Sequence, residues 1–503
     1  MQHNLTKSKY TSFRTCPKAL WLEVFKNEVK IIDDNALDRF ATGHEVGELA
    51  KGYLGSYEDM TVMNGDAPDC GAMIAKTEDA LKRGVENICE AAFSIDGCYC
   101  AVDILHKSGN GYEIYEVKSS TSGDKEIYAW DVAFQKYVLQ RRGLQVVGTY
   151  LLHIDNTYVR HGELEIDKLF KKHDIADAVD KELEGIQERI QEAKRILGKG
   201  EPDTPLSMSC RKPYDCAFWQ YCSRELPKPS VFDLYRMDWV KRFELYLSGK
   251  VSFEDIRSMK LNRIQRMQVD GALKGEKHID KDKIRTFLDN LAGPGKNLYP
   301  LYFLDFESIQ PAIPLFDGTK PYQQIPTQYS LHIQDSVGAE PRHLDFLAPS
   351  RGNPMKAIAE NLCKDIPKDA IVLVYNKTFE CGRLQELADR FDTLKDHLLA
   401  IKNNIRDLLV PFQHGDYYLP AMGGNFSIKS VLPALFPDDP DLDYHALDET
   451  CRNGVDAKNI FPRLKDMSPE EENRTRQALL DYCKLDTLAM VKVLGKLYEA
   501  ISS

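Results

Sequence analysis

The stretch that most constrains this chain is Ala101–Ser122, which reads AVDILHKSGNGYEIYEVKSSTS. Apolar residues flank Asp103, the turn-forming segment SGNG follows, and the next run alternates apolar with charged side chains, as is typical of a β-hairpin. Glu116 and Lys118 stand two residues apart on the second strand, so their side chains share one face of it. The pattern therefore predicts that Asp103, Glu116 and Lys118 meet at one end of a hairpin.

These three residue types suit the hydrolysis of a phosphodiester bond. Two carboxylates hold a hard divalent cation through oxygen ligands, and a neighbouring ammonium group orients a water or stabilises charge on a phosphate. The alternative interpretation is a surface hairpin with solvated charges, because such a triple also arises by chance.

With these residues the hairpin resembles the PD-(D/E)XK nucleases of the RecB type, especially the iron–sulfur exonucleases of CRISPR adaptation and the AddB-type recombination nucleases. The resemblance implies a restriction-endonuclease-like α/β domain that cleaves DNA with Mg²⁺ or Mn²⁺. The metal ligands that it implies are His44, Asp103, Glu116 and the Val117 carbonyl. Lys118 would assist the attacking water, and Gln135 matches a glutamine that the family carries on the next helix. Leu139 stands where the family often has a tyrosine.

Four of the twelve cysteines form a second pattern. Cys16 precedes Pro17 at the head of an expected helix, and CRKPYDCAFWQYC contains Cys210, Cys216 and Cys222 at equal spacing. Four thiolates suit a [4Fe–4S] cluster or a tetrahedral zinc ion. The resemblance implies a [4Fe–4S] cluster that staples the ends of the nuclease domain, although C-x5-C-x5-C departs from the familiar spacing and keeps zinc as the alternative. The other cysteines are expected to be small buried residues.

A second carboxylate constellation lies in the last two hundred residues. YPLYFLDFESI predicts a buried strand that carries Asp305 and Glu307 on one face. Glu380 follows the apolar strand of AIVLVYNKTFE, and a late helix places Tyr482 and Asp486 one turn apart. Acidic residues on three separate elements are expected to assemble a two-metal phosphodiesterase centre.

Together these motifs resemble the DnaQ-like, DEDD-type 3′–5′ exonucleases of the RNase H-like fold. The resemblance implies that Asp305, Glu307, Glu380 and Asp486 bind two metals while Tyr482 orients the attacking water. Glu380, which follows Asn376 in the motif, replaces the usual aspartate, and the extra methylene shifts a ligand by about an ångström. Asp407 is a further acidic candidate. A scaffold that keeps this fold without turnover is the alternative, and the C-terminal half also resembles a bacterial domain of unknown function.

The length of 503 residues predicts two or three domains. We expect a PD-(D/E)XK domain at 1–225, a helical connector at 226–297 and an RNase H-like domain at 298–503, with α/β folds in both outer parts. Residues 166–200 are expected to form one long amphipathic helix. Helix-turn-helix DNA binding by the connector is a weaker alternative.

The formal net charge of −11 excludes a binder that relies on a global positive field, so nucleic-acid binding would depend on local basic patches and bound metal. The chain shows neither a membrane-spanning apolar run nor the apolar core of a signal peptide, which predicts a cytoplasmic protein. The sequence thus predicts a metal-dependent nuclease with a second 3′–5′ exonuclease-like site, with single-stranded DNA favoured and RNA as the other substrate. The rival hypothesis is a non-cutting, nucleic-acid-binding iron–sulfur scaffold of a defence or repair complex. No particular protein partner is predicted.

Overall fold

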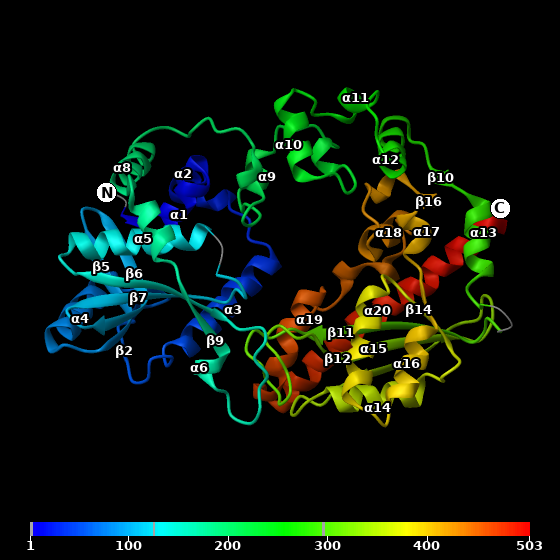
Figure 1. The fold of residues 1–503 in the computed structure, drawn as a ribbon. Helices are drawn as coiled ribbons and strands as arrows, with labels where there is room; N and C mark the ends of the chain where they lie inside the picture. The colour runs from blue at the N-terminus through cyan, green and yellow to red at the C-terminus, as the bar shows by residue number, and fades with distance from the viewer. Residues whose placement is uncertain (1–3, 124–125, 294–296, 503) are drawn as a thin grey trace. The chain divides into compact units, whose positions relative to one another are not determined.

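The structure is a computed structural model that describes residues 4–123, 126–293 and 297–502. The chain divides into two compact units, each built around one mixed β-sheet. Unit 1 comprises Met1–Glu225 with Pro311–Gln323, and unit 2 comprises Leu226–Gln310 with Gln324–Ser503. The protein is therefore α/β throughout (Figure 1). Residues 226–297, the predicted connector, fall within unit 2, and residues 311–323 fall within unit 1.

The sheet of unit 1 has the strand order β2-β5-β6-β7-β8-β9, with β1 beside β6. Its strands are β1 (Leu5–Thr6), β2 (Glu58–Asp59), β5 (Asn87–Ile95), β6 (Cys98–Ser108), β7 (Gly111–Lys118), β8 (Val146–Ile154) and β9 (Phe170–Asp174). β6 and β7 pair antiparallel up to Ser108 and Gly111, which confirms the predicted hairpin. β8 then runs parallel to β7. A small hairpin, β3 (Met63–Asn64) with β4 (Ala67–Pro68), completes the strands of this unit.

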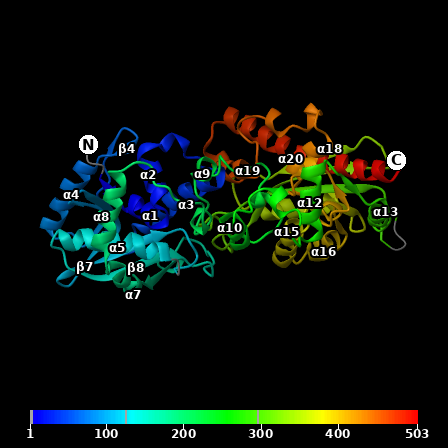
Figure 2. The ribbon, with the colours of Figure 1, turned by 90° about the horizontal axis from the view of Figure 1, so that it is seen from above.

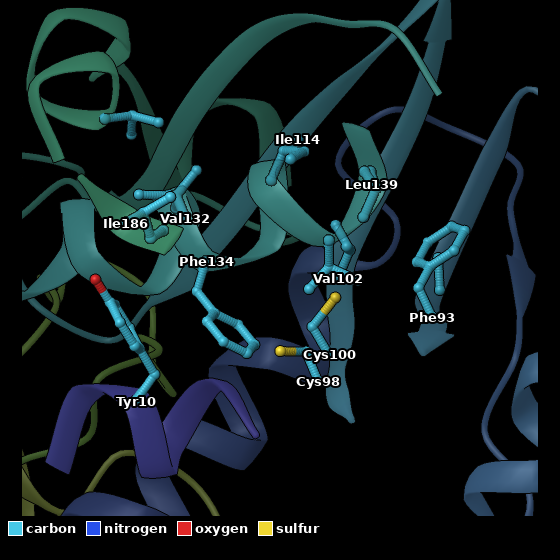
Figure 3. Close-up of a cluster of buried hydrophobic side chains, with 14 of the residues drawn as sticks. Tyr10, Phe93, Cys98, Cys100, Val102, Ile114, Val132, Phe134, Leu139 and Ile186 are labelled. Atoms are coloured by element: carbon cyan, nitrogen blue, oxygen red, sulfur yellow. The ribbon is translucent and has the colours of Figure 1, made fainter. Parts of the chain in front are cut away.

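Helices cover both faces of this sheet. They are α1 (Lys7–Thr15), α2 (Pro17–Phe25), α3 (Asp34–Ala50), α4 (Cys70–Arg83), α5 (Glu126–Arg141), α6 (Ile166–Leu169), α7 (Ala176–Leu183), α8 (Ile186–Leu197) and α9 (Trp219–Cys222). On one face, Phe134 of α5 packs among strand residues such as Val102 and Ile114, and Tyr10 of α1 stacks on it with ring centroids 5.2 Å apart (Figure 3). On the other face, α3 packs on β7 and contributes Val46 to a second apolar cluster. The β7 strand is thus held between α5 and α3.

The prediction of a single long helix at 166–200 is wrong. The chain forms α6, β9, α7 and α8 there, and Gly185 separates the last two helices in a left-handed conformation with φ of 72°. Glycine adopts this conformation without steric cost, so the helical pattern breaks where the sequence offers Glu184-Gly185.

The segment Pro311–Gln323 follows strand β11 of unit 2 in the chain and packs within unit 1. The Arg160 guanidinium donates to the Pro314 carbonyl at 3.0 Å, the Gly162 N–H donates to Asp317 Oδ1 at 2.8 Å, and the Tyr322 hydroxyl donates to the Ser119 carbonyl. Ser119 directly follows the Lys118 strand. These hydrogen bonds explain why Pro311–Gln323 belongs to unit 1, although the sequence analysis expected residues 298–503 to form one domain.

The main sheet of unit 2 has the strand order β13-β12-β11-β14-β15. The strands are β11 (Leu301–Ile309), β12 (Ile325–Gln334), β13 (Arg342–Leu347), β14 (Ile371–Val374) and β15 (Ile405–Asp407), and a separate pair joins β10 (His278–Ile279) to β16 (Tyr417–Tyr418). β12 lies antiparallel to β11, whereas β14 and β15 run parallel to β11. The carboxyl ends of β11, β14 and β15 therefore meet at one edge of the sheet.

The helices of unit 2 are α10 (Trp239–Leu247), α11 (Phe253–Ile256), α12 (Arg263–Lys274), α13 (Lys281–Asp289), α14 (Met355–Asp365), α15 (Thr378–Arg390), α16 (Lys395–Asn403), α17 (Val410–Gln413), α18 (Ile428–Leu435), α19 (Gly454–Ile460) and α20 (Pro469–Ser502). α20 crosses one face of the sheet against β11 and β12, and Figure 2 shows α15 and α16 on the opposite side. None of the described helices combines the length and apolar character that a membrane span requires.

Candidate functional site

Unit 1 brings four of the predicted residues together. Glu116 and Lys118 lie on β7, and the Lys118 ammonium donates to Glu116 Oε1 at 2.7 Å. From α5, Gln135 Nε2 donates to Glu116 Oε2 at 2.6 Å. Asp103 lies on the paired strand β6, where its Oδ2 accepts the Val117 N–H at 2.7 Å. The antiparallel pairing of β6 with β7 therefore assembles Asp103, Glu116 and Lys118 as the hairpin predicts.

Two further residues of this site were missed by the sequence reasoning. Lys7, the first residue of α1, places its ammonium 2.9 Å and 3.1 Å from the two Glu116 oxygens and 3.5 Å from Asp103 Oδ1. Asp131 of α5 accepts from Lys118 at 2.8 Å. A lysine in the first turn opposes the helix dipole, and this unfavourable placement is the one sequence signal that Lys7 has another role.

Charge within unit 1 is largely balanced by the protein itself. Burial alone would raise the pKa of Glu116, but the charges of Lys118 and Lys7 outweigh it and lower that pKa to about 2. Burial raises the pKa of Asp103, and the Glu116 charge adds to the effect. Burial and the Asp103 charge raise the pKa of Glu90, on β5, to about 7. Glu90 is a third missed residue, and its φ of 53° marks a locally unusual backbone.

His44 does not join this group. It lies exposed on α3, and among the described residues it forms no group with Asp103 and Glu116 in which the candidate ligand atoms approach within 4.8 Å. Packing of α3 against β7 nevertheless keeps its helix on the strand that carries Glu116.

The four predicted cysteines line one small cavity of about 20 Å³. Cys16 stands between α1 and α2, and the other three lie in the segment that ends with α9: Cys210, Cys216 and Cys222. Burial raises the pKa of the Cys216 thiol to about 11, with the other three thiols adding to the effect. The Glu201 carboxylate ties these segments together because it pairs with Lys18 at 3.0 Å and accepts from Tyr221 at 2.9 Å. Residues nearly two hundred positions apart thus converge, although among the described residues no three of these sulfur atoms all lie within 4.8 Å of one another.

Unit 2 assembles the acidic constellation more tightly. Asp305 and Glu307 of β11 and Asp486 of α20 offer carboxylate oxygens that all lie within 4.8 Å of one another. Burial raises the pKa of Asp305 and of Glu307 well above the ordinary range, and the Asp486 charge adds to both. Three carboxylates this close repel one another, so the arrangement favours a bound cation.

Glu380 adds a fourth carboxylate. It is 2% exposed at the start of α15, and its Oε2 is buried with no hydrogen-bond partner among the described residues. Its charge contributes to the raised pKa of both Asp305 and Glu307, and burial raises its own pKa to about 8. A buried carboxylate oxygen without a donor is costly in a folded protein, and a metal ligand role explains it.

Asp407 has a different place from the one expected. Its oxygens accept the backbone N–H groups of Asn376, Lys377 and Leu409 at 2.9, 3.1 and 3.0 Å. Asn376 has a φ of 74°, so this turn needs such support. Asp407 therefore fixes the turn between β14 and α15 that presents Glu380.

Tyr482 lies beside the acidic group and contacts a residue that the sequence reasoning missed. The Lys429 ammonium of α18 donates to the Tyr482 hydroxyl at 3.1 Å and lies 5.1 Å from the ring centroid. Tyr444, also missed, donates its hydroxyl to Asp486 Oδ1 at 2.6 Å. Burial raises the pKa of Tyr482 far above its usual range, and the Asp486 charge adds to this. A tyrosine that stays protonated here can donate a hydrogen bond to a water or a phosphate oxygen.

Comparison with known proteins gives a match to one family model, over residues of unit 2 and the unit 1 segment Pro311–Gln323. Residues 302–427 match the family model of a domain of unknown function, DUF2779. The match includes Asp305, Glu307 and Glu380 and ends before Asp486.

The chain is also similar to curated proteins of Ureaplasma parvum and Mycoplasma genitalium. The chain is 29% identical over 220 residues to "uncharacterized protein UU173" of Ureaplasma parvum serovar 3, an alignment that covers 38% of this chain and 30% of that protein. It is 24% identical over 208 residues to "uncharacterized protein MG366" of Mycoplasma genitalium, with 38% of this chain and 31% of that protein covered. The chain thus spans less than a third of the length of the curated relatives it matches. Neither these names nor the family description states an activity.

Proposed function

We propose that this chain is a metal-dependent nuclease whose principal hydrolytic centre lies in unit 2. One observation carries the proposal: Asp305, Glu307 and Asp486 converge within 4.8 Å. The unpartnered Oε2 of the buried Glu380 beside them fits the same interpretation. Carboxylate oxygens are the ligands that Mg²⁺ and Mn²⁺ prefer, so Asp305, Glu307, Asp486 and Glu380 would hold the ions. Divalent cations, when bound, activate a water and neutralise charge on the scissile phosphate.

The surrounding side chains supply orientation and charge. Tyr444 holds one Asp486 oxygen, which fixes the direction of that carboxylate. The Lys429 charge opposes the raised pKa of both Glu307 and Asp486, so it faces the carboxylates. Tyr482 accepts from Lys429 and also hydrogen-bonds to Asp486, so its hydroxyl would orient an attacking water by turning from that carboxylate. Lys429 and Tyr482 thereby provide a polar, positively charged side to the acidic centre.

Unit 1 is proposed as a second nuclease centre, with Asp103 and Glu116 as ligands and Lys118 as the group that assists water. The convergence of Gln135 and Lys118 on Glu116 supports this assignment. Lys7 bridges the two carboxylates, so a divalent cation would compete with its ammonium. We propose a [4Fe–4S] cluster on the four cysteines, with zinc as the alternative. A tetrahedral zinc would hold all four sulfur atoms about 3.8 Å apart, whereas among the described residues no three of them lie within 4.8 Å of one another.

The test measures degradation of end-labelled single-stranded DNA and RNA by anaerobically purified protein, with Mn²⁺ and with EDTA. Asp305→Asn should abolish the trimming that unit 2 performs, by at least about 100-fold, because it removes a ligand of the centre. Asp335→Asn is the matched control, since Asp335 is an exposed carboxylate of the same unit. Lys118→Ala assigns any remaining cleavage to unit 1.

If Asp305→Asn trims as fast as the wild type, the unit 2 assignment is wrong. If neither substrate is cut by any preparation while both bind, the non-cutting scaffold is the better description.

A further inference from the structure

A second feature of unit 2 is a pocket of about 470 Å³ at the carboxyl edge of the main sheet. Residues of α13 form one wall, and the ends of β14 and β15 form the other; Lys377 and Arg406 come from these strand ends. Crevices at the carboxyl ends of parallel strands are the usual place for ligands in open α/β sheets. α13 belongs to the predicted connector at 226–297, for which the sequence analysis named no catalytic residue.

Two cations of this pocket lack an acidic partner. Among the described residues, neither Lys377 nor Arg406 has a carboxylate oxygen within 4.0 Å. Arg406 donates Nε to the Leu291 carbonyl at 3.1 Å and Nη1 to the Ile405 carbonyl at 3.0 Å. These two bonds fix the guanidinium plane, and Nη2 has no acceptor among the described residues.

The acidic residues of the pocket are already engaged within the protein. Asp416 lies 3.5 Å from both the Lys283 ammonium and the Arg263 guanidinium. Asp407 accepts three backbone N–H groups, as described above. The charge that the pocket presents to a ligand is therefore positive, from Lys377 and Arg406.

The remaining wall is apolar and includes the ring of Phe287 with Leu291 and Val410. A volume of about 470 Å³ is far larger than a lone phosphate needs and lies in the usual range of small-molecule sites. An aromatic ring and apolar side chains beside fixed cations suit a planar base linked to a phosphate.

We propose that this pocket binds a nucleoside phosphate, either a free nucleotide or one unit of a single-stranded nucleic acid. The strand form rests on the proposed function, because the same sheet edge carries Asp305. The parallel register of β11 with β14 ends at Phe303 and Leu373, two residues before Asp305 on one strand and four residues before Lys377 on the other. A strand seated in the pocket would therefore lie along the edge that leads to the carboxylate centre.

The experiment measures binding of AMP and of a 5′-labelled single strand to the full chain in EDTA, where cleavage does not occur. Lys377→Glu should weaken both ligands by about tenfold, the effect of losing one charge-assisted hydrogen bond. Asn290→Trp, which fills the pocket, should act in the same direction. Lys241→Glu is the control, because this exposed lysine of α10 has no ion pair among the described residues.

The binding results of the pocket variants identify the occupant of the pocket or overturn the proposal. If both ligands weaken in the two pocket variants, the occupant is a unit of the strand, and the salt dependence of strand binding should fall by about one phosphate contact. If AMP alone weakens, the occupant is a free nucleotide. If the pocket variants bind both ligands like Lys241→Glu, or if the wild type binds neither, the proposal is overturned.

Failure of the proposed function is distinguishable from failure of this inference. If ligand binding depends on Lys377 but no Mn²⁺-dependent cleavage occurs, the pocket proposal stands and the nuclease proposal is wrong. If cleavage depends on Asp305 but ligand binding is unchanged in Lys377→Glu, the nuclease proposal stands and the pocket proposal is wrong.

Discussion

Replacing Lys7 with methionine should destabilise metal-free unit 1 by about 3 kcal/mol. The Lys7 ammonium lies 2.9 Å from Glu116 Oε1 and 3.5 Å from Asp103 Oδ1. At an effective dielectric constant of about 20, unit charges about 3 Å apart attract by about 5 kcal/mol. Because both Lys7 and Asp103 side chains are 23% exposed, solvent recovers part of this energy after the substitution.

Calorimetry in EDTA measures the effect, which should lower the melting temperature of unit 1 by about 6–12 °C for a domain of this size. Lys9→Met is the matched control on the same helix, since within the described part of the chain its ammonium donates to the Asn4 carbonyl alone, at 3.2 Å. The control should change stability by less than about 0.5 kcal/mol.

The reasoning also predicts how Mn²⁺ acts on this variant. Without the competing ammonium, the cation should raise the melting temperature of unit 1 more in Lys7→Met than in the parent. The comparison is made in the Asp305→Asn background so that Mn²⁺ binding to unit 2 contributes less to the measured rise in melting temperature. The charge-balance argument is refuted if Lys7→Met and Lys9→Met lower the melting temperature equally. It is also refuted if Mn²⁺ raises the melting temperature of Lys7→Met and of the parent by the same amount.

Three further predictions concern other groups. Burial lowers the pKa of His332 from 6.5 to about 3. The His332 side chain therefore stays neutral in the folded protein, whereas in the unfolded chain it takes up a proton below pH 6.5. The free energy of unfolding of unit 2 should consequently fall by about 2 kcal/mol between pH 6.5 and pH 5. Urea unfolding of unit 2 at both values checks this, and His332→Gln should lack that part of the loss. Cys16→Ser should reduce bound iron and acid-labile sulfide by more than half, measured on anaerobic protein, and zinc in their place would favour the alternative. Glu380→Gln should slow Mn²⁺-dependent trimming by about 100-fold with its EDTA melting temperature undiminished, because burial keeps the metal-free carboxyl group largely protonated and the amide replaces it without adding a charge; trimming at the parental rate would exclude Glu380 as a ligand.

The sequence predicts those parts of the sites that share a local pattern. Glu116 and Lys118 lie two apart on one strand, and the hairpin register delivers Asp103 to them. Asp305 and Glu307 follow the same rule on β11. In each case a period of two and a turn signal suffice, because they fix the direction of the side chains before any tertiary contact is known.

The residues that sequence reasoning missed reach the sites through tertiary packing. Lys7 meets Glu116 across 109 residues, and Lys429 meets Tyr482 across 53. Helix packing, which a single sequence does not encode as a spacing, decides both contacts. Similarly, no composition signal marks Pro311–Gln323 as part of unit 1, since hydrogen bonds from residues such as Arg160 and Tyr322 hold it there.

The two carboxylate groups solve the problem of like charge in different ways. In unit 1, Lys7 and Lys118 face Asp103, Glu116 and Asp131, so the folded chain supplies its own counter-charge. In unit 2 the described cation beside the carboxylates is Lys429, and the pKa values of Asp305 and Glu307 stay raised.

Repulsion that is left uncompensated lowers the stability of the metal-free fold and increases the gain from binding a cation. Unit 2 should therefore depend on divalent metal for both stability and chemistry. Unit 1 should admit the metal only as Lys7 gives way. Because α1 carries Lys7 at its start and leads directly to Cys16, any group that the four cysteines hold would also fix the helix from which Lys7 reaches the carboxylates.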